Sequence, residues 1–388
     1  MNILDYLATE FASFDEKPFN PVDSVILSQF CMVRMELIAP MGSNWQRPAG
    51  FGRALKSRLA PARPVRFADA LRAELFPTLF SGFDPDLIKE TLVALAASPR
   101  FRDLSIEHCA SMFDEDEHVQ FAAMTFSRKR EFAYVGFRGT DQSFTGWRED
   151  FDMAYRMPVP AQELAVRYLE AVAPHLPKRL MVGGHSKGGN LAQYAALRAR
   201  PAVRERIERV YDHDGPGFGA GAVDDKEYAT IAPRVHKTVP QESVVGMLLE
   251  TPADCTLRVV RSAGRGMQQH SPFNWEVAEG DFAYADRLSE AALSAHAVSS
   301  QWLAGLDRNQ TRQIVEAAFE AIRASNALDA SDLISGGPRT ISLLVEAAKN
   351  IDPESRDVLL RALAPLANLM AQDTARSVAS RFSPKPKA

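Results

Sequence analysis

The segment 179–192 constrains the fold more strongly than any other part of the sequence. It begins with the apolar run Leu180-Met181-Val182 and passes through Gly183-Gly184-His185-Ser186-Lys187-Gly188-Gly189 before a helix-forming stretch. This order predicts a strand, a tight turn and a helix. Glycine at positions 184 and 188 lets the strand and the helix approach closely, because a Cβ there would clash. The sequence therefore places Ser186 at the apex of a sharp turn.

Residues 184–188 fit the pattern G-x-S-x-G of a nucleophile elbow, in which a strained turn lifts a serine hydroxyl above a sheet. The helix after the turn directs backbone N–H groups and the positive end of its dipole toward that serine. The alternative is a glycine-rich turn that binds phosphate. Against it, the segment contains neither G-x-G-x-x-G nor a Gly-Lys-Ser/Thr sequence. The pattern favours Ser186 as a nucleophile.

The composition of the chain argues against several other classes of function. The chain has 388 residues, 46% of them hydrophobic, which is enough for one large domain with an appendage. A net charge of -4 gives no indication of nucleic acid or an anionic membrane as a partner. Three distant cysteines and no Cys/His cluster indicate neither a disulfide framework nor a metal site, and we expect no cofactor. Without a signal peptide or a long apolar run, we expect no membrane span and a cytoplasmic location.

The order of elements predicts an α/β fold. Residues 1–100 have a helical pattern, and three strands in 105–140 predict an antiparallel meander. Alternating helices and strands follow, which predicts a largely parallel, doubly wound sheet. The expected strands are 106–113, 118–126, 131–137, 179–182, 207–211, 235–239 and 256–261, and the expected late helices are 284–303, 310–324, 340–348 and 354–370. We predict a domain at 1–288, with 1–100 as its helical part, and a helical region at 289–388.

A serine nucleophile needs a base and an acid that orients the base. In this kind of fold the chain order is serine, acid, histidine. His270 follows the last predicted strand, whereas His296 lies in an alanine-rich helix and is the weaker candidate. Two acids qualify: Asp214 after strand 207–211, in a tight Gly-Pro-Gly setting, and Glu242 after strand 235–239. We prefer Asp214 and keep Glu242 as the alternative.

An acyl-transfer site also needs donors for the oxyanion. One expected donor is the backbone N–H of Lys187, which follows the nucleophile. The other is Thr140, after strand 131–137, through its N–H and its hydroxyl. The alternative is that Arg138-Gly139-Thr140 merely ends a strand.

Several blocks carry a family resemblance. Phe137-Arg138-Gly139-Thr140, followed by Trp147 and Asp150, resembles the F-R-G-T…W…D signature of class 3 lipases, and 184–192 matches their G-H-S-x-G-G-x-L-A. The chain is more closely similar to a bacterial family of uncharacterised α/β hydrolases, the Mbeg-like family. The blocks similar to that family are 2–7, 214–218, 243–249 and Gln269-His270 with Trp275.

The resemblance implies an α/β-hydrolase fold and a serine hydrolase that cleaves a carboxylic ester of a small molecule or lipid. It implies Ser186 as nucleophile, His270 as base, and Thr140 with Lys187 at the oxyanion. It leaves the acid open, because class 3 lipases carry an aspartate where this chain has Gln241-Glu242-Ser243. A catalytically inactive α/β-hydrolase fold that acts as a binding or regulatory module is the alternative. Substrate identity, oligomeric state and the role of the helical end do not follow from the sequence.

Overall fold

The computed structural model describes residues 1–41, 64–324 and 337–382. The chain divides into two compact units, Met1–Leu288 and Ser289–Ala388. Each unit has its own hydrophobic core and is described by itself.

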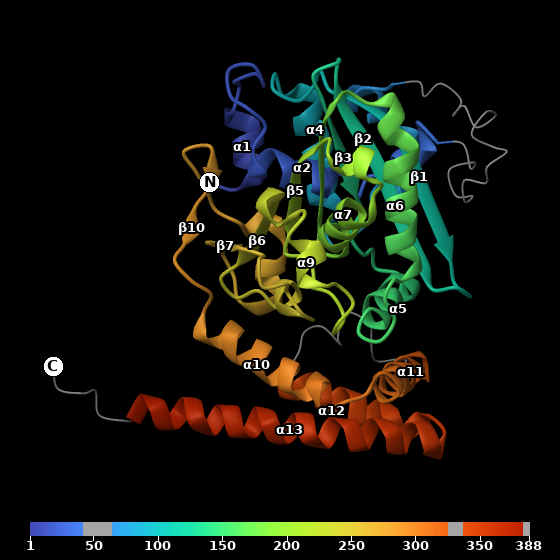
Figure 1. Ribbon diagram of the computed structural model, residues 1–388, viewed down its shortest axis with the longest axis vertical. Coiled ribbons are helices and arrows are strands. Elements are labelled where there is room, and N and C mark those ends of the chain that lie inside the picture. The colour runs from blue at the N-terminus through green and yellow to red at the C-terminus, as the bar shows by residue number, and fades with distance from the viewer. Residues whose placement is uncertain (42–63, 325–336, 383–388) are drawn as a thin grey trace. The chain divides into compact units, whose positions relative to one another are not determined.

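The first unit is built on an eight-stranded sheet with the order β1-β2-β3-β4-β5-β6-β7-β10 (Figure 1). Strands β1 to β3 pair antiparallel, β3 to β7 pair parallel, and β10 closes the edge antiparallel to β7. The strands are β1 (Ser105–Asp114), β2 (Val119–Arg128), β3 (Phe132–Phe137), β4 (Arg179–His185), β5 (Ile207–His213), β6 (Val235–Pro240), β7 (Leu257–Val260) and β10 (Tyr284–Ala285), with β8 (Val277–Ala278) and β9 (Asp281–Phe282) forming a separate pair.

The helices of this unit lie before and between the strands. They are α1 (Ile3–Thr9), α2 (Pro21–Phe30), α3 (Phe76–Leu79), α4 (Pro85–Ala97), α5 (Phe144–Asp152), α6 (Pro160–Val172), α7 (Lys187–Arg198), α8 (Pro201–Arg204) and α9 (Asp225–Tyr228). Helix α2 shows why the sequence folds as it does: the Asn20 side chain caps the N–H groups of Val22 and Asp23, and proline occupies the first helical position.

Side chains along the central strands point alternately to the two faces of the sheet, and each face carries its own hydrophobic core. In β4, Leu180 and Val182 face one core, and Met181 between them faces the other. Helices α6 and α7 cover the first face, and their apolar residues include Leu164, Leu169, Leu191 and Ala195. Because the parallel strands follow one another in chain order, right-handed crossovers bring these helices to the same face.

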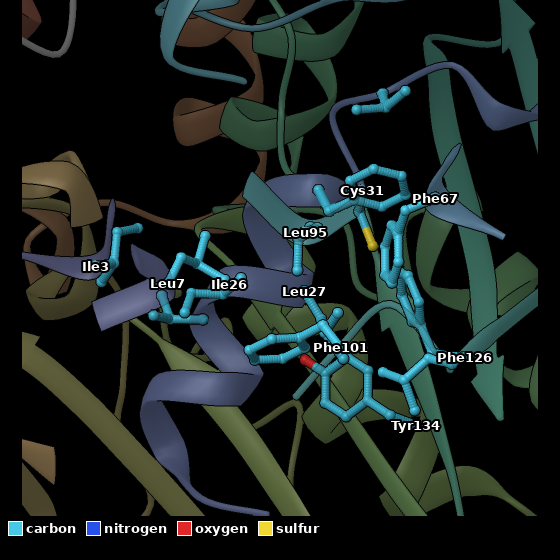
Figure 2. Packing of buried hydrophobic residues seen from close by; sticks show 14 of the residues in the cluster. Ile3, Leu7, Ile26, Leu27, Cys31, Phe67, Leu95, Phe101, Phe126 and Tyr134 are labelled. Atoms are coloured by element: carbon cyan, nitrogen blue, oxygen red, sulfur yellow. The ribbon is translucent and has the colours of Figure 1, made fainter. Parts of the chain in front are cut away.

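The N-terminal helices cover the second face. Figure 2 shows Leu27 and Cys31 of α2 beside the rings of Phe67, Phe126 and Tyr134. The Tyr134 hydroxyl lies 2.9 Å from the hydroxyls of both Ser24 and Ser28, so this buried polar group is satisfied within the core. The helical part that precedes the sheet is therefore an integral layer of the first unit.

The second unit is helical. It contains α10 (Glu290–Ala304), α11 (Arg308–Ala324), α12 (Gly337–Ala347) and α13 (Pro353–Phe382). Its core joins Ala321 of α11, Leu344 of α12 and Leu359 and Leu363 of α13. The Trp302 indole N–H donates to the Ala362 carbonyl at 3.0 Å, which ties α10 to α13.

The α/β fold class, the antiparallel meander and the parallel strands are confirmed. The prediction of a helix over 284–303 is wrong at its beginning, since Tyr284–Ala285 forms β10 and the helix begins at Glu290. Helix α13 also continues to Phe382, beyond the predicted end. Within the described parts of the chain, the helices are all too short or too polar to cross a membrane.

Candidate active site

Ser186 lies between the end of β4 and the first residue of α7. Its backbone has φ 58° and ψ -132°, a strained conformation for a residue with a side chain. A Cβ on Gly184 would lie 2.2 Å from the main-chain carbon of Gly188, and a Cβ on Gly188 would lie 2.2 Å from the Phe137 carbonyl oxygen. The two glycines are therefore required by backbone packing, and together they form the sharp turn expected at this serine.

The loop after β3 passes beside Ser186. A Cβ on Gly139 would lie 2.8 Å from the His185 carbonyl oxygen and 3.5 Å from the Ser186 Cβ. Thr140 follows in this loop, and its hydroxyl donates to the carboxylate of Asp150 on α5. The hydroxyl proton is thus committed to Asp150, so the predicted oxyanion donation by Thr140 would fall to its backbone N–H alone.

The side chain of Lys187 is fully buried below the turn. Its ammonium group makes three hydrogen bonds: to the Gln120 carbonyl at 2.9 Å, to Gln120 Oε1 at 2.7 Å and to Glu149 Oε2 at 3.0 Å. Burial by itself would lower the pKa of Lys187, but Glu149 and Asp150 hold it above its usual value. Lys187 therefore stays charged and ties the start of α7 to β2 and α5.

Asp150 completes this cluster. Burial raises the pKa of its carboxyl group to about 6, although Lys187 and the Thr140 hydroxyl both favour the ionised form. The distance from Asp150 Oδ1 to Lys187 Nζ is 3.6 Å. The position of the Thr140 hydroxyl is thus coupled to a carboxylate that titrates close to neutral pH.

Asp214 and His270 meet at the carboxyl ends of the strands. Asp214 follows β5, and its Oδ2 lies 2.6 Å from Nδ1 of His270, at the end of the short 3-10 helix Gly266–His270. The Asp214 side chain is completely buried and that of His270 is 15% exposed. An imidazole held at Nδ1 by a carboxylate presents Nε2 as its free nitrogen.

The carboxylate of Asp214 is fixed from several sides. Its Oδ1 accepts hydrogen bonds from the Ser243 hydroxyl at 2.5 Å and the Gly246 N–H at 3.2 Å. Its own backbone has φ 54° and donates to the Thr238 carbonyl at 2.7 Å. These contacts hold Oδ1 on one side of the carboxylate and leave Oδ2 facing His270 Nδ1.

Glu242, the alternative acid, has a different neighbour. Its Oε2 accepts the N–H of Gly266 at 2.7 Å, and its own N–H donates to Gln269 Oε1 at 2.8 Å. Glu242 thus braces the loop that carries His270 without contacting the imidazole. Asp212, two residues before Asp214, pairs instead with Lys237 at 2.7 Å.

His185 is a site residue to which sequence reasoning assigned no role. Its Nε2 lies 2.8 Å from the main-chain oxygen of His270, and the two rings are 4.5 Å apart between centroids. Burial, followed by the neighbouring His270 and His213 rings, holds the pKa of His185 well below its usual value. Because a carbonyl only accepts, the neutral ring carries its proton on Nε2. Its place in the G-H-S-x-G motif was the only signal available in the sequence.

The structure thus gathers Ser186, Thr140 and Lys187 around one turn, and Asp214 with His270 beside it. Glu242, the other acid predicted from the sequence, contacts Gly266 and Gln269 in the loop that carries His270. In the described ranges, no group of three or more His, Cys, Asp or Glu side chains is arranged to hold a metal ion. The arrangement is suited to nucleophilic chemistry at a serine.

This fold, with a glycine-flanked elbow at the carboxyl end of a parallel strand, defines a hydrolase-like α/β protein. The model of the Mbeg1-like family matches residues 95–320, more than half of the chain. The chain belongs to the Mbeg1-like family, which confirms the resemblance noted in the sequence.

Among solved structures, the chain is similar to one described as the crystal structure of M37 lipase. The two are 15% identical, the TM-score is 0.28, and the match covers 42% of this chain and 63% of the lipase chain. The chain therefore spans less than two thirds of that lipase. No curated protein matches this sequence.

Proposed function

We propose that this protein is a serine hydrolase that cleaves a carboxylic ester through an acyl-enzyme. The observation that carries the proposal is the 2.6 Å contact between Asp214 and His270 beside the strained turn at Ser186. Serine, aspartate and histidine in this chain order, at the carboxyl ends of parallel strands, supply the groups that acyl transfer requires.

In the proposed first step, Ser186 Oγ attacks the ester carbonyl carbon and His270 Nε2 takes the hydroxyl proton. Asp214 keeps the imidazole in the tautomer with its proton on Nδ1 and stabilises the imidazolium that forms. The negative charge on the carbonyl oxygen is stabilised by the N–H groups of Lys187 and Thr140. His270 then returns the proton to the departing alcohol, which leaves the acyl group on Ser186.

In the second step, water attacks the acyl carbon and gives a proton to His270. The ester bond to Ser186 breaks, the proton returns to Ser186 Oγ and the carboxylic acid leaves. No cofactor is needed for either step. The buried Lys187–Glu149–Asp150 cluster supports both steps by fixing the elbow against the loop that contains Thr140.

The proposal is tested with p-nitrophenyl esters of increasing acyl length. We expect the wild-type protein to release p-nitrophenol and the Ser186→Ala variant to lose this activity, while Ser300→Ala, on exposed α10, keeps it. The chain-length series identifies the preferred acyl group. Equal turnover by wild type and Ser186→Ala with every ester would contradict the proposal and favour a non-catalytic binding module.

A further inference from the structure

A cavity lies at the opposite end of the parallel strands from Ser186. Ser186 and Asp214 follow the carboxyl ends of β4 and β5, whereas this cavity is lined by residues near the amino ends of β5, β6 and β7. Its volume is about 600 Å³, within the range of small-molecule sites. It is half-open, with Pro21 at the start of α2 and Tyr284 of β10 among its walls (Figure 1 labels α2, β5, β6, β7 and β10).

Two guanidinium groups line this cavity. Arg209 lies on β5 and Arg258 on β7, and among the described residues neither forms an ion pair with a carboxylate. Within the described ranges, the hydrogen bond that Arg209 donates is a long one, 3.4 Å, to the Pro233 carbonyl. The cavity is therefore lined by two arginine side chains whose positive charges are not paired with a described carboxylate.

His236 lies between these arginines at the start of β6. Burial, followed by the charges of Arg258 and Arg209, lowers the pKa of His236 to about 3, so the imidazole is neutral at physiological pH. Its Nε2 is buried and has no hydrogen-bond partner among the described residues. A neutral imidazole with one free nitrogen is able to accept or donate a hydrogen bond.

Two further atoms on the same sheet face share this property. Thr238 Oγ1 and His213 Nδ1 are buried and, in the described part of the chain, also have no hydrogen-bond partner. The register pairs Tyr211 with His236 and His213 with Thr238, so these side chains lie on neighbouring rows of one face. Neither Thr238 nor His213 lines the cavity, so within the described ranges His236 Nε2 is the unpaired buried polar atom that a ligand in the cavity could meet.

The remaining lining restricts the chemistry of the occupant. Tyr211 and Val235 supply apolar surface, whereas Asp281 and Asp286 add two negative charges. Asp281 Oδ1 already accepts the Phe282 N–H at 2.7 Å and the Tyr284 hydroxyl at 3.3 Å. Two arginines balanced by two aspartates disfavour a polyanion such as nucleic acid and fit a small molecule with one compact anionic group.

We propose that this cavity binds a small organic anion, a carboxylate or phosphate monoester with an apolar body. The anionic group lies between Arg209 and Arg258, a polar atom of the ligand bonds to His236, and the body packs against Tyr211 and Val235. Arginine matches both anions through paired N–H donors. The site is separate from Ser186, and its existence does not depend on the proposed hydrolase activity.

The test is calorimetric titration of the full-length protein with phenyl phosphate, hexanoate and inorganic phosphate. We expect saturable binding of one phenyl phosphate per chain, tighter than inorganic phosphate because of the apolar body. Arg209→Gln and Arg258→Gln should each weaken binding by roughly tenfold to a hundredfold. Both arginines are exposed, so these variants should fold normally. Arg312→Gln, on exposed α11, and Ser186→Ala should bind as the wild type does.

Vesicles of phosphatidylcholine with and without phosphatidic acid distinguish the source of the anion. Arginine-dependent binding to the phosphatidic acid vesicles would identify a lipid headgroup, whereas binding of phenyl phosphate alone would identify a soluble metabolite. The proposal is overturned if none of the probes binds saturably, if the double variant Arg209→Gln/Arg258→Gln binds as tightly as wild type, or if Ser186→Ala abolishes binding.

Discussion

The ring of His185 holds the main chain of His270: the 2.8 Å hydrogen bond from His185 Nε2 to the His270 carbonyl joins residues 85 positions apart. The residue immediately before the candidate nucleophile thus positions the candidate base. Since desolvation holds the pKa of His185 well below its usual value, its ring is neutral at physiological pH and can keep this donor.

Replacing His185 should therefore impair turnover without removing any reacting group. His185→Phe keeps a ring of similar shape but leaves the His270 carbonyl without its donor. We expect kcat to fall by a few-fold to about tenfold, the effect of one ordinary hydrogen bond. Measured esterase kinetics check this, and an unchanged kcat with normal folding would show that His270 needs no such support.

The assignment of the acid predicts a ranking of two variants. Asp214→Asn should lower kcat by about 10⁴-fold, because the amide favours the wrong imidazole tautomer. Glu242→Gln should have a much smaller effect, since Glu242 contacts the loop backbone and not the ring. Circular dichroism of both variants controls for folding. The opposite ranking would move the acid to position 242.

The buried ion pair of Lys187 and Glu149 predicts that substitutions of these two residues have strongly coupled effects on stability. Lys187→Met leaves the Glu149 carboxylate buried without its cation and should reduce the free energy of unfolding by about 3–5 kcal/mol. Adding Glu149→Gln removes the uncompensated charge and should restore part of that loss. Urea unfolding of the wild type, both single variants and the double variant measures the coupling. Strictly additive losses would argue against a shared network.

The raised pKa of Asp150 predicts a pH-dependent difference in stability. The carboxyl pKa is about 6 in the folded chain and 3.8 ordinarily, so folding favours the protonated form. The contribution of Asp150 to stability is therefore full below about pH 4 and is lost as the pH rises through 6. Asp150→Asn is neutral throughout, so its free energy of unfolding relative to wild type should rise between pH 4 and 7, by at most about 3 kcal/mol.

The matched control for this measurement is Asp116→Asn, in the exposed turn between β1 and β2. The difference between the free energy of unfolding of Asp116→Asn and that of wild type should stay constant between pH 4 and 7. A flat or falling difference for Asp150→Asn would mean that Asp150 is ionised in the folded chain at all these pH values.

The central elements could be predicted because their patterns are strong and local. Alternation in 105–140 and the apolar runs at 179–182 and 207–211 identify strands, and glycines flanking Ser186 identify the elbow. The two-residue strand Tyr284–Ala285 was missed because it is too short to show a period of two, and the helical pattern that follows extended over it.

The supporting contacts of the site could not be predicted, because they depend on long-range geometry. A lysine is ordinarily exposed, so nothing in the sequence indicates that the Lys187 side chain is buried against Glu149 and Gln120. The same holds for Ser243, whose hydroxyl orients Asp214 from 29 positions away. Chain order and turn chemistry limited the acid to two positions with a preference for Asp214, and the contact of its carboxylate with His270 adds a spatial argument that the sequence could not supply.

Covalent labelling tests the central proposal most directly. The intact mass of the protein is measured after incubation with a fluorophosphonate, followed by peptide mapping, for wild type, Ser186→Ala and Ser300→Ala. The Ser-His-Asp arrangement predicts one adduct per chain, located on Ser186, in wild type and Ser300→Ala and none in Ser186→Ala. Labelling of Ser186→Ala at the wild-type rate, or no labelling of folded wild type, would contradict it.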